Sequence, residues 1–237
     1  RGGDRPNLLY FADMALAASA HGITVHPRPD QRHITAQDTR DLAMHLKAYR
    51  RLNPERDSEF NMEGNPFEGS LGSFPGFLNL VKEALPDQVT LVPDALDQKT
   101  SDHGWDFQTD GERLAPIVKE LQGLGLRVSV FVDPVEEAIN GAHELGVDRI
   151  EFYTEDYAKS HAKGKGEASF KIYARLAEKA HALGLEINAG HDLNLENLPL
   201  FSTLPYLKEV SIGQALVTDA LEFGFSESVK RYLDALR

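Results

Sequence analysis

A unit that recurs along the chain limits the possible folds most: a helical pattern, then a glycine, then a short apolar strand that ends in a polar residue. Four copies have their glycine and strand at Gly22 with 23–26, Gly125 with 128–133, Gly146 with 150–153, and Gly184 with 186–191. A glycine just past a helix commonly adopts the left-handed conformation that ends the helix and permits a short connection. The repetition therefore predicts strands that alternate with helices.

Three further strand-like stretches, at 59–63, 88–93 and 209–213, bring the expected number of strands to seven. Helical patterns lie near 36–51, 75–85, 111–123, 134–145, 168–183 and 224–236. Alternation of this kind is typical of βαβ units around a parallel sheet. Because no low-complexity linker or change of composition divides the chain, we expect a single α/β domain over residues 1–237.

Two architectures fit this alternation, a closed (β/α)8 TIM barrel and a doubly wound open sheet. A doubly wound sheet predicts a glycine-rich phosphate fingerprint after its first strand. Gly123 and Gly125 precede a strand instead, and the chain has no P-loop pattern. We therefore predict a (β/α)8 TIM barrel. Such a barrel has eight strands, and the opening residues 1–3 resemble the loop after a strand, so the first strand is expected to lie upstream of the given chain.

Composition excludes several classes of function. The net charge of −12 disfavours nucleic acid or an anionic membrane as a partner. The chain has no cysteine, so it offers no disulfide, thiolate nucleophile or thiolate metal ligand. A run of about 18 apolar residues and a signal-peptide pattern are both absent from the sequence given. We expect a soluble, cytoplasmic protein.

One stretch, residues 22–34, changes from an apolar strand to a cationic loop within a single residue. Its β-branched start has the composition of a buried strand, and two prolines restrict the loop that follows. Four side chains in this loop are cationic or can become so: His26, Arg28, Arg32 and His33. In an acidic chain, such a cluster predicts a site for an anionic ligand with a proton to transfer.

Functional side chains of (β/α)8 barrels lie at the carboxyl ends of the strands. The expected strand ends carry histidines and carboxylates, at His26, Glu63, Asp94, Asp133, Glu151 and His191. Imidazole titrates near neutral pH, and a nearby carboxylate can orient it or hold it charged. The joint placement of His26, Glu63 and His191 predicts acid–base catalysis. Asp94 remains open between a structural and a functional role, and Asp133 is expected to cap the next helix.

Two groups of residues are candidates for binding phosphate. Gly213 and Gln214 follow the last strand, where barrels often bind phosphate on free backbone amides at a helix start. A second site could draw charge from the cationic loop and hydroxyls from Thr100 and Ser101. Arg1 adds charge to one of the two sites.

Five blocks of sequence together resemble the pyridoxine 5′-phosphate synthase family. They occur in order along essentially the whole chain, at 22–34, 60–66, 90–94, 187–193 and 210–213. The resemblance implies a (β/α)8 enzyme that condenses 3-amino-2-oxopropyl phosphate with 1-deoxy-D-xylulose 5-phosphate. The products would be pyridoxine 5′-phosphate, phosphate and water. It also implies that no metal or organic cofactor takes part, and that the chain forms a homo-octamer built from dimers.

The same resemblance implies roles for individual residues. His26 matches the family's general base, Glu63 a second acid–base group, His191 the proton donor, and Glu151 a carboxylate that supports the amino-ketone end. The positions that hold deoxyxylulose phosphate are matched by Arg28, His33 and Thr100. Those around the other phosphate are matched by Arg1, Asp192, Gly213 and Gln214.

The chain departs from the family pattern in three places. The family's first strand, which carries Asn, Asp and His side chains for both substrates, is absent from the given sequence. Asp192 stands where many members have glycine, and Gln214 where many have histidine. We expect the Asp192 side chain to face away from a phosphate or to cap the next helix. The departures concern phosphate contacts and leave the acid–base residues unchanged.

Two other classes of function remain open on the residues alone. Histidine and glutamate at strand ends also hold divalent metals in lyases and isomerases that act on phosphosugars. A non-catalytic phosphosugar-binding protein would also fit the missing strand, Asp192 and Gln214. A metal requirement for activity would favour the first class, and binding without turnover would favour the second.

Overall fold

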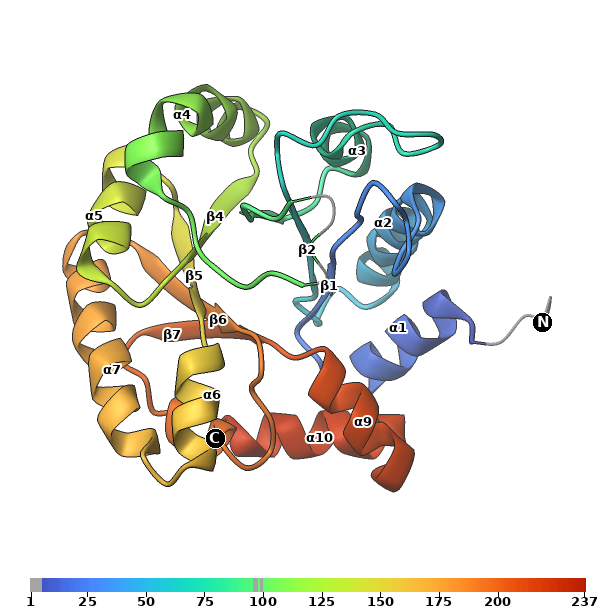
Figure 1. Cartoon of the computed structure of the whole chain (residues 1–237). Coiled ribbons are helices and arrows are strands. Elements are labelled where there is room, and N and C mark those ends of the chain that lie inside the picture. The colour runs from blue at the N-terminus through green and yellow to red at the C-terminus, as the bar shows by residue number, and fades with distance from the viewer. Residues whose placement is uncertain (1–5, 96–97, 99) are drawn as a thin grey trace.

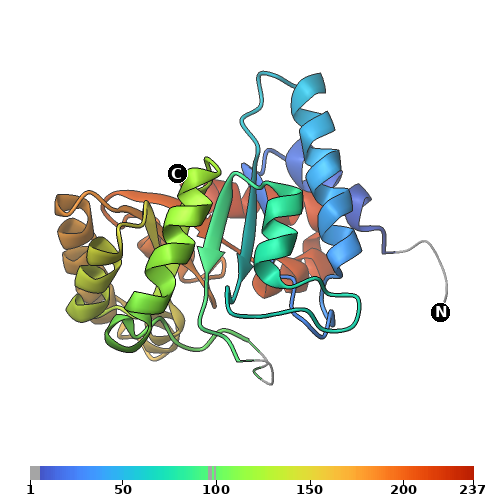
Figure 2. The ribbon, with the colours of Figure 1, turned by 90° about the horizontal axis from the view of Figure 1, so that it is seen from above.

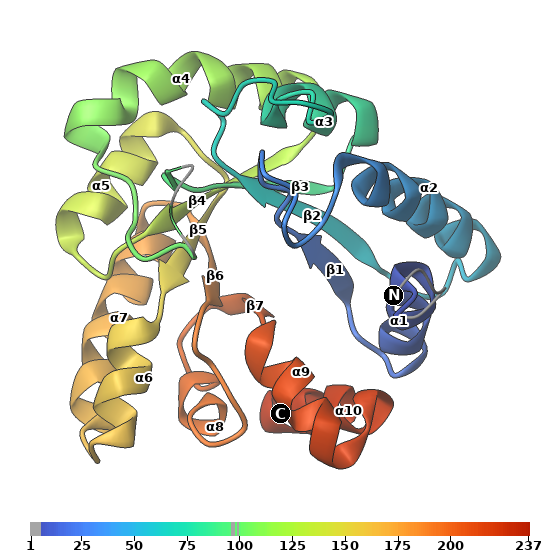
Figure 3. The ribbon, with the colours of Figure 1, turned by 45° about the vertical axis from the view of Figure 1, so that its right-hand side comes forward.

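The computed structural model describes residues 6–95, 98 and 100–237. At its centre, seven parallel strands follow one another in sequence order, each paired with the next. Figures 1 and 3 show this sheet curving into a nearly closed barrel with helices around its outside. The strands are β1 (Gly22–Val25), β2 (Glu59–Gly64), β3 (Gln88–Leu91), β4 (Arg127–Val132), β5 (Arg149–Tyr153), β6 (Glu186–Gly190) and β7 (Leu207–Ser211). All seven overlap the predicted strands, and the TIM-barrel fold class is confirmed.

The expected helices are present as α2 (Ala36–Leu52), α3 (Phe77–Ala84), α4 (Phe107–Gly123), α5 (Glu136–Leu145), α7 (Gly166–Ala182) and α10 (Phe225–Ala235). Figure 2 shows α2, α3 and α4 covering the outer face of the sheet. Large apolar side chains such as Leu42, Phe77 and Leu121 are fully buried between helices and strands. Burial of this apolar surface is the main stabilising contribution to the fold.

Four helices were not predicted: α1 (Leu8–Ala17), α6 (Glu155–Ala162), α8 (Leu198–Phe201) and α9 (Gln214–Phe223). Each lacks the one-sided apolar pattern on which the prediction depended. In α6 only Tyr157 is buried, α9 buries none of its residues, and α8 is four residues long. Their places are set by neighbouring elements more than by their own sequence.

The recurring glycines have two different structural roles. Gly125, Gly146 and Gly184 have φ values of 78°, 77° and 85°, which confirms the predicted left-handed ends of helices. Gly22 does not have a positive φ, so the same interpretation is wrong there. A Cβ at Gly22 would lie 2.6 Å from the carbonyl oxygen of Glu59 on the adjacent strand. Glycine is needed at that point because two backbones approach closely.

The predicted helix cap at Asp133 is also wrong. Helix α5 begins at Glu136, and Val135 occupies the N-cap position. The carbonyl of Asp133 accepts a hydrogen bond of 2.8 Å from the Val135 amide. The chain therefore makes a tight turn at Pro134 before the helix starts, which places Asp133 too early to cap it.

The barrel is open on one side. Within the described residues, β1 and β7 each pair with a single strand, β2 and β6 respectively, and not with each other. Helices α1 and α10 lie beside this opening in Figure 1, and the rings of Phe11 and Phe225 meet edge to face at 5.1 Å between centroids. The expected eighth strand stays a prediction.

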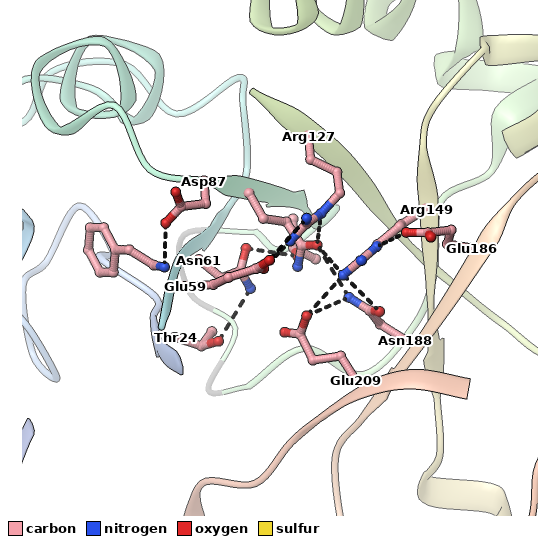
Figure 4. A network of polar contacts seen from close by, with 12 residues as sticks. Thr24, Glu59, Asn61, Asp87, Arg127, Arg149, Glu186, Asn188 and Glu209 are labelled. Atoms are coloured by element: carbon pink, nitrogen blue, oxygen red, sulfur yellow. Dashed lines mark hydrogen bonds and ion pairs between the residues drawn. The ribbon is translucent and has the colours of Figure 1, made fainter. Parts of the chain in front are cut away.

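A network of charged and amide side chains fills the barrel at the amino ends of the strands (Figure 4). Arg149 donates to Glu186 at 2.7 Å, to Gln88 at 3.0 Å and to Glu209 at 3.1 Å. Arg127 donates to Gln88 on the adjacent strand β3 at 2.9 Å and pairs with Glu59 on β2, two strands away. Because buried charges need partners, the side chains of this network pair with one another. They lie at the end of the barrel opposite the predicted catalytic residues.

Candidate active site at the carboxyl ends of the strands

A cavity of about 1790 Å³ extends along the inside of the barrel and reaches the opening between β1 and β7. Most of the predicted site residues line it: His26, His33, Glu63, Thr100, Glu151, His191, Asp192, Gly213 and Gln214. Arg28 is not part of this lining, and Arg1 lies outside the described residues. Side chains up to 188 positions apart in the sequence are thus brought to one cavity, the arrangement that the barrel topology predicts.

His26 and Glu63 form the closest pair in the cluster. His26 directly follows β1, and its Nδ1 lies 3.1 Å from Glu63 Oε1 on the adjacent strand β2. Burial alone would raise the pKa of Glu63, but the neighbouring His26, His191 and Arg28 outweigh it and hold that pKa below its ordinary value. Glu63 is therefore a charged carboxylate that can orient the imidazole and stabilise its protonated form.

Glu151, unlike Glu63, is a neutral carboxyl group. It lies on β5, is 1% exposed, and its pKa is raised well above the ordinary value by burial and by the charge of Glu63. Its Oε2 atom is buried and accepts no hydrogen bond from any described residue. One charged and one neutral carboxyl group side by side provide a base and an acid in the same cavity.

The protonated state of Glu151 predicts a pH dependence of stability. Its folded-state pKa lies above the unfolded value of 4.5, so the native state binds the extra proton and loses stability as pH rises. Glu151→Gln, which mimics the neutral acid, should gain stability relative to the wild type as the pH rises from the unfolded value of 4.5 toward the raised folded-state pKa. Urea unfolding of both proteins across this range measures the difference. Exposed Glu112→Gln is the control, and a pH-independent difference for Glu151→Gln would contradict the assignment.

Gly190 gives Glu151 its space. A Cβ at position 190 would collide with Glu151 Oε1. We expect Gly190→Ala to displace this carboxyl group and to destabilise the fold by about 1–3 kcal/mol, the usual cost of overpacking. Activity should fall further than stability explains, because the carboxyl group moves within the cavity. Ala189→Gly on the same strand is a matched control, and a Gly190→Ala enzyme with normal activity would contradict the prediction.

His191 begins the turn after β6 and has a φ of 76°. Its imidazole ring lies between Phe131 at the end of β4 and Tyr153 at the end of β5, with centroid distances of 5.0 and 5.4 Å. Two aromatic rings therefore fix the plane of the imidazole, while its edge remains on the cavity. The arrangement suits a group that delivers a proton to a bound molecule.

Arg28 is buried beside an acidic side chain. It is 5% exposed, and its Nη2 lies 2.5 Å from Asp94 Oδ2. The same oxygen accepts from the Ser101 hydroxyl at 2.8 Å and lies 3.9 Å from His26 Nε2. Asp94, whose role the sequence left open, thus contacts the cationic loop, the Ser101 loop and the His26 imidazole. A phosphate that uses Arg28 has to approach it beside this carboxylate.

The remaining predicted phosphate residues lie on two sides of the cavity. His33 has a pKa lowered by partial burial and by Arg32 and Arg28, so it is a neutral hydrogen-bonding group. Gly213 is the N-cap of α9, and no side chain caps that helix end. The free backbone amides at the start of α9 can bind an anion. Gln214 adds a neutral amide there.

Asp192 occupies a backbone conformation that glycine adopts more easily than other residues. Its φ is 55°, in the left-handed region. Glycine adopts this conformation without steric cost, and aspartate is one of the few other residues that tolerates it. Asp192 is exposed and is part of the cavity lining, and Asn197, not Asp192, is the N-cap residue of the next helix, α8.

Sequence reasoning assigned no role to four residues around His191: its ring partners Phe131 and Tyr153, of which only Tyr153 was noted as a strand-end residue, and two buried polar residues, Thr154 and Asn197. Thr154 and Asn197 directly precede α6 and α8, where such residues ordinarily cap helices. Neither side chain makes a helix-capping hydrogen bond in the structure. The sequence signal was present, but it pointed to a local role.

The described residues contain no group of three or more histidine and carboxylate side chains arranged to hold a metal ion. Among the helices of the same part of the chain, none is both long and apolar enough to span a membrane.

The fold and the cavity define a class, TIM-barrel proteins in which imidazole and carboxyl groups from several strand ends line one cavity. The model of the family described as Pyridoxal phosphate biosynthesis protein PdxJ matches residues 1–237, and the chain belongs to this family.

Curated relatives are similar over nearly their whole length. A pyridoxine 5′-phosphate synthase from Xanthomonas axonopodis pv. citri is 48% identical over 100% of this chain and 91% of its own length. One from Christiangramia forsetii is 47% identical over 100% and 93%. Among solved structures, a 3-hexulose-6-phosphate synthase has a TM-score of 0.59 at 16% identity and covers 97% of this chain and 93% of its own. That likeness extends to the fold alone.

Proposed function

We propose that this chain is a pyridoxine 5′-phosphate synthase that condenses 3-amino-2-oxopropyl phosphate with 1-deoxy-D-xylulose 5-phosphate. Its products would be pyridoxine 5′-phosphate, inorganic phosphate and water. Family membership supports the reaction, and the observation that carries the site is the His26–Glu63 pair beside a protonated Glu151 and His191 in one cavity. These groups meet the demand of the chemistry for repeated proton transfers in one place.

The proton-transferring groups divide by their electrostatic state. His26, oriented by the Glu63 carboxylate at 3.1 Å, acts as the general base, and Glu63 supports the resulting imidazolium. His191 acts as the proton donor when a leaving oxygen departs. Neutral Glu151 donates a hydrogen bond to the amino-ketone end. Each well-placed acid or base contributes about 10²–10⁴ in rate, so several together can drive imine formation, loss of phosphate, ring closure and dehydration.

Two anion sites would hold the reacting partners. Arg28, His33 and Thr100 would bind the phosphate of deoxyxylulose phosphate, and Gly213, Gln214 and the Asp192 backbone would bind the other. Anchoring both substrates lowers the entropic cost of bringing the amine to the ketone. His33 and Thr100, from the loops after β1 and β3, and Gly213 and Gln214, after β7, line the same cavity and support this division.

The direct experiment mixes both substrates with the full-length protein and measures pyridoxine 5′-phosphate and released phosphate. We expect one phosphate per pyridoxine 5′-phosphate, and no product when either substrate is omitted. Activity that needs an added divalent metal, measured against a chelator-treated control, would favour a metal-dependent enzyme. Binding of both substrates without product would favour a non-catalytic protein.

Replacing Arg28 tests which of the two substrates binds with its phosphate at this residue. Arg28→Ala should raise the KM for deoxyxylulose phosphate more than the KM for the amino ketone, because only the first phosphate would contact the guanidinium. Steady-state kinetics with each substrate varied in turn measures both constants. Arg32→Ala, in the same loop, serves as a comparison. Equal increases of the two KM values would contradict the assignment.

We also propose that the protein acts in the cytoplasm as a homo-oligomer, with an octamer built from dimers as the expected form. Large apolar side chains on α9, such as Val217 and Leu221, are 59% and 86% exposed, as they would be on a surface that a second subunit covers. Light scattering on the purified protein measures the number of subunits, and a monomer would contradict the proposal.

A further inference from the structure

The chain adopts a sterically costly conformation directly at the proposed proton donor. His191 and Asp192 are consecutive, neither is glycine, and both have positive φ, 76° and 55°. A positive φ is uncommon outside glycine, and two in succession require support from the surroundings. The turn between β6 and α8 must therefore be held by contacts that favour it over an extended chain.

Two buried side chains provide this support. Thr154 is fully buried, and its hydroxyl lies 2.8 Å from the carbonyl oxygen of Gly190 and also contacts that of His191. The Gly190 carbonyl already accepts from the Thr154 amide at 3.1 Å. The single hydroxyl proton is therefore available to the His191 carbonyl.

Asn197 holds the next peptide. It is 3% exposed, and its Nδ2 donates to the carbonyl oxygen of Asp192 at 2.9 Å. Its Oδ1 accepts from the Asn194 amide at 2.9 Å, and its own carbonyl accepts from the Tyr157 hydroxyl at 2.6 Å. Both polar atoms of the Asn197 side-chain amide therefore bond to the turn or to the residues that continue it.

The positions of these residues in the fold strengthen the argument. Thr154 and Asn197 are the N-cap residues of α6 and α8, yet neither side chain caps its helix. A capping side chain normally stabilises its own helix through the free amides of the first turn. In both cases the side chain makes its hydrogen bonds to the turn that carries His191 instead.

We infer that Thr154 and Asn197 are positioning residues that hold the His191–Asp192 turn in its left-handed form and so fix the His191 imidazole against Phe131 and Tyr153. This role rests on the proposed function of His191 as proton donor. It also accounts for an aspartate at position 192: two buried hydrogen-bonding side chains stabilise a conformation that glycine would adopt unaided.

The test compares Thr154→Val, which keeps the shape and removes the hydroxyl, with Thr154→Ser, which keeps the hydroxyl. We expect Thr154→Val to lower kcat by about 100-fold, the order of loss seen when a catalytic group is misplaced by an ångström. The KM values of both substrates should change only a few fold, and Thr154→Ser should retain most of the activity. Exposed Thr203→Val is the matched control. Asn197→Asp, which keeps the acceptor and loses the donor, should resemble Thr154→Val.

Rescue separates positioning from general loss of stability. Asp192→Gly in the Thr154→Val background should recover most of kcat, because glycine adopts a positive φ without the hydrogen bonds that the Thr154 hydroxyl makes to the turn. Thermal unfolding of each variant shows whether all were folded in the assay. A Thr154→Val enzyme with wild-type kcat, or a double variant without recovery, would overturn the inference.

A spectroscopic measurement keeps the inference independent of the proposed reaction. The ring protons of His191 should be shifted by the ring currents of Phe131 and Tyr153, and a His191→Gln spectrum assigns their NMR signals. Thr154→Val should move these signals toward unstructured values, and Thr154→Ser should not. If the wild type forms no pyridoxine 5′-phosphate, the proposed function fails while this measurement still decides the positioning role. Unmoved His191 signals in Thr154→Val would overturn that role.

Discussion

His191→Ala should abolish measurable turnover while both substrates still bind with affinities within a few fold of the wild type. The imidazole is held by Phe131 and Tyr153 at the edge of the cavity, where it can protonate a leaving oxygen but does not anchor either phosphate. Loss of a general acid ordinarily costs about 10²–10⁴ in rate. The effect should therefore appear in kcat and not in KM.

Single-turnover kinetics and equilibrium binding together measure this separation. His181→Ala is the matched control, since that ring stacks on Tyr206 at 3.6 Å on the protein surface and does not line the cavity. A His191→Ala enzyme that keeps most of its activity would remove the residue from the mechanism. A large loss of affinity would instead make His191 a binding residue.

Glu63→Gln should lower kcat by about 10²–10⁴. The substitution keeps the shape and a possible hydrogen bond to His26 Nδ1, 3.1 Å away in the wild type, and removes the negative charge. Without that charge the imidazolium formed after proton abstraction loses its stabilising partner. The charge that raises the pKa of Glu151 is removed as well, so this group should titrate closer to its ordinary value.

The pH profile of kcat distinguishes this electrostatic role from a purely structural one. In Glu63→Gln, the limb that reports Glu151 should move to lower pH, because the charge of Glu63, besides burial, raises the pKa of Glu151. Glu186→Gln is the matched control: burial would raise the pKa of Glu186, but Arg149 holds it below the ordinary value, and Glu186 lies in the network at the amino ends of the strands (Figure 4). A Glu63→Gln enzyme with an unchanged profile and rate would contradict the proposed role.

The order and type of the main elements follow from sequence patterns that act locally. Short, largely apolar runs predicted all seven strands, four of them after a glycine, because a buried parallel strand needs a continuous apolar stretch. One-sided apolar periodicity located six of the helices. Helices α6 and α9 escaped this reasoning because they bury one residue and none, and α8 escaped it because it is only four residues long.

For the site, the sequence by itself determined which residue types stand at the strand ends, since a parallel barrel places all of those ends at one rim. It named His26, Glu63, Glu151 and His191 on that basis. Only the tertiary structure decided their chemical states. Burial and the proximity of Glu63 set the protonation of Glu151, and Asp94, far from Arg28 in sequence, partners its charge. Charge, burial and hydrogen bonding depend on distances through space, and the order of residues along a chain does not contain those distances until it folds.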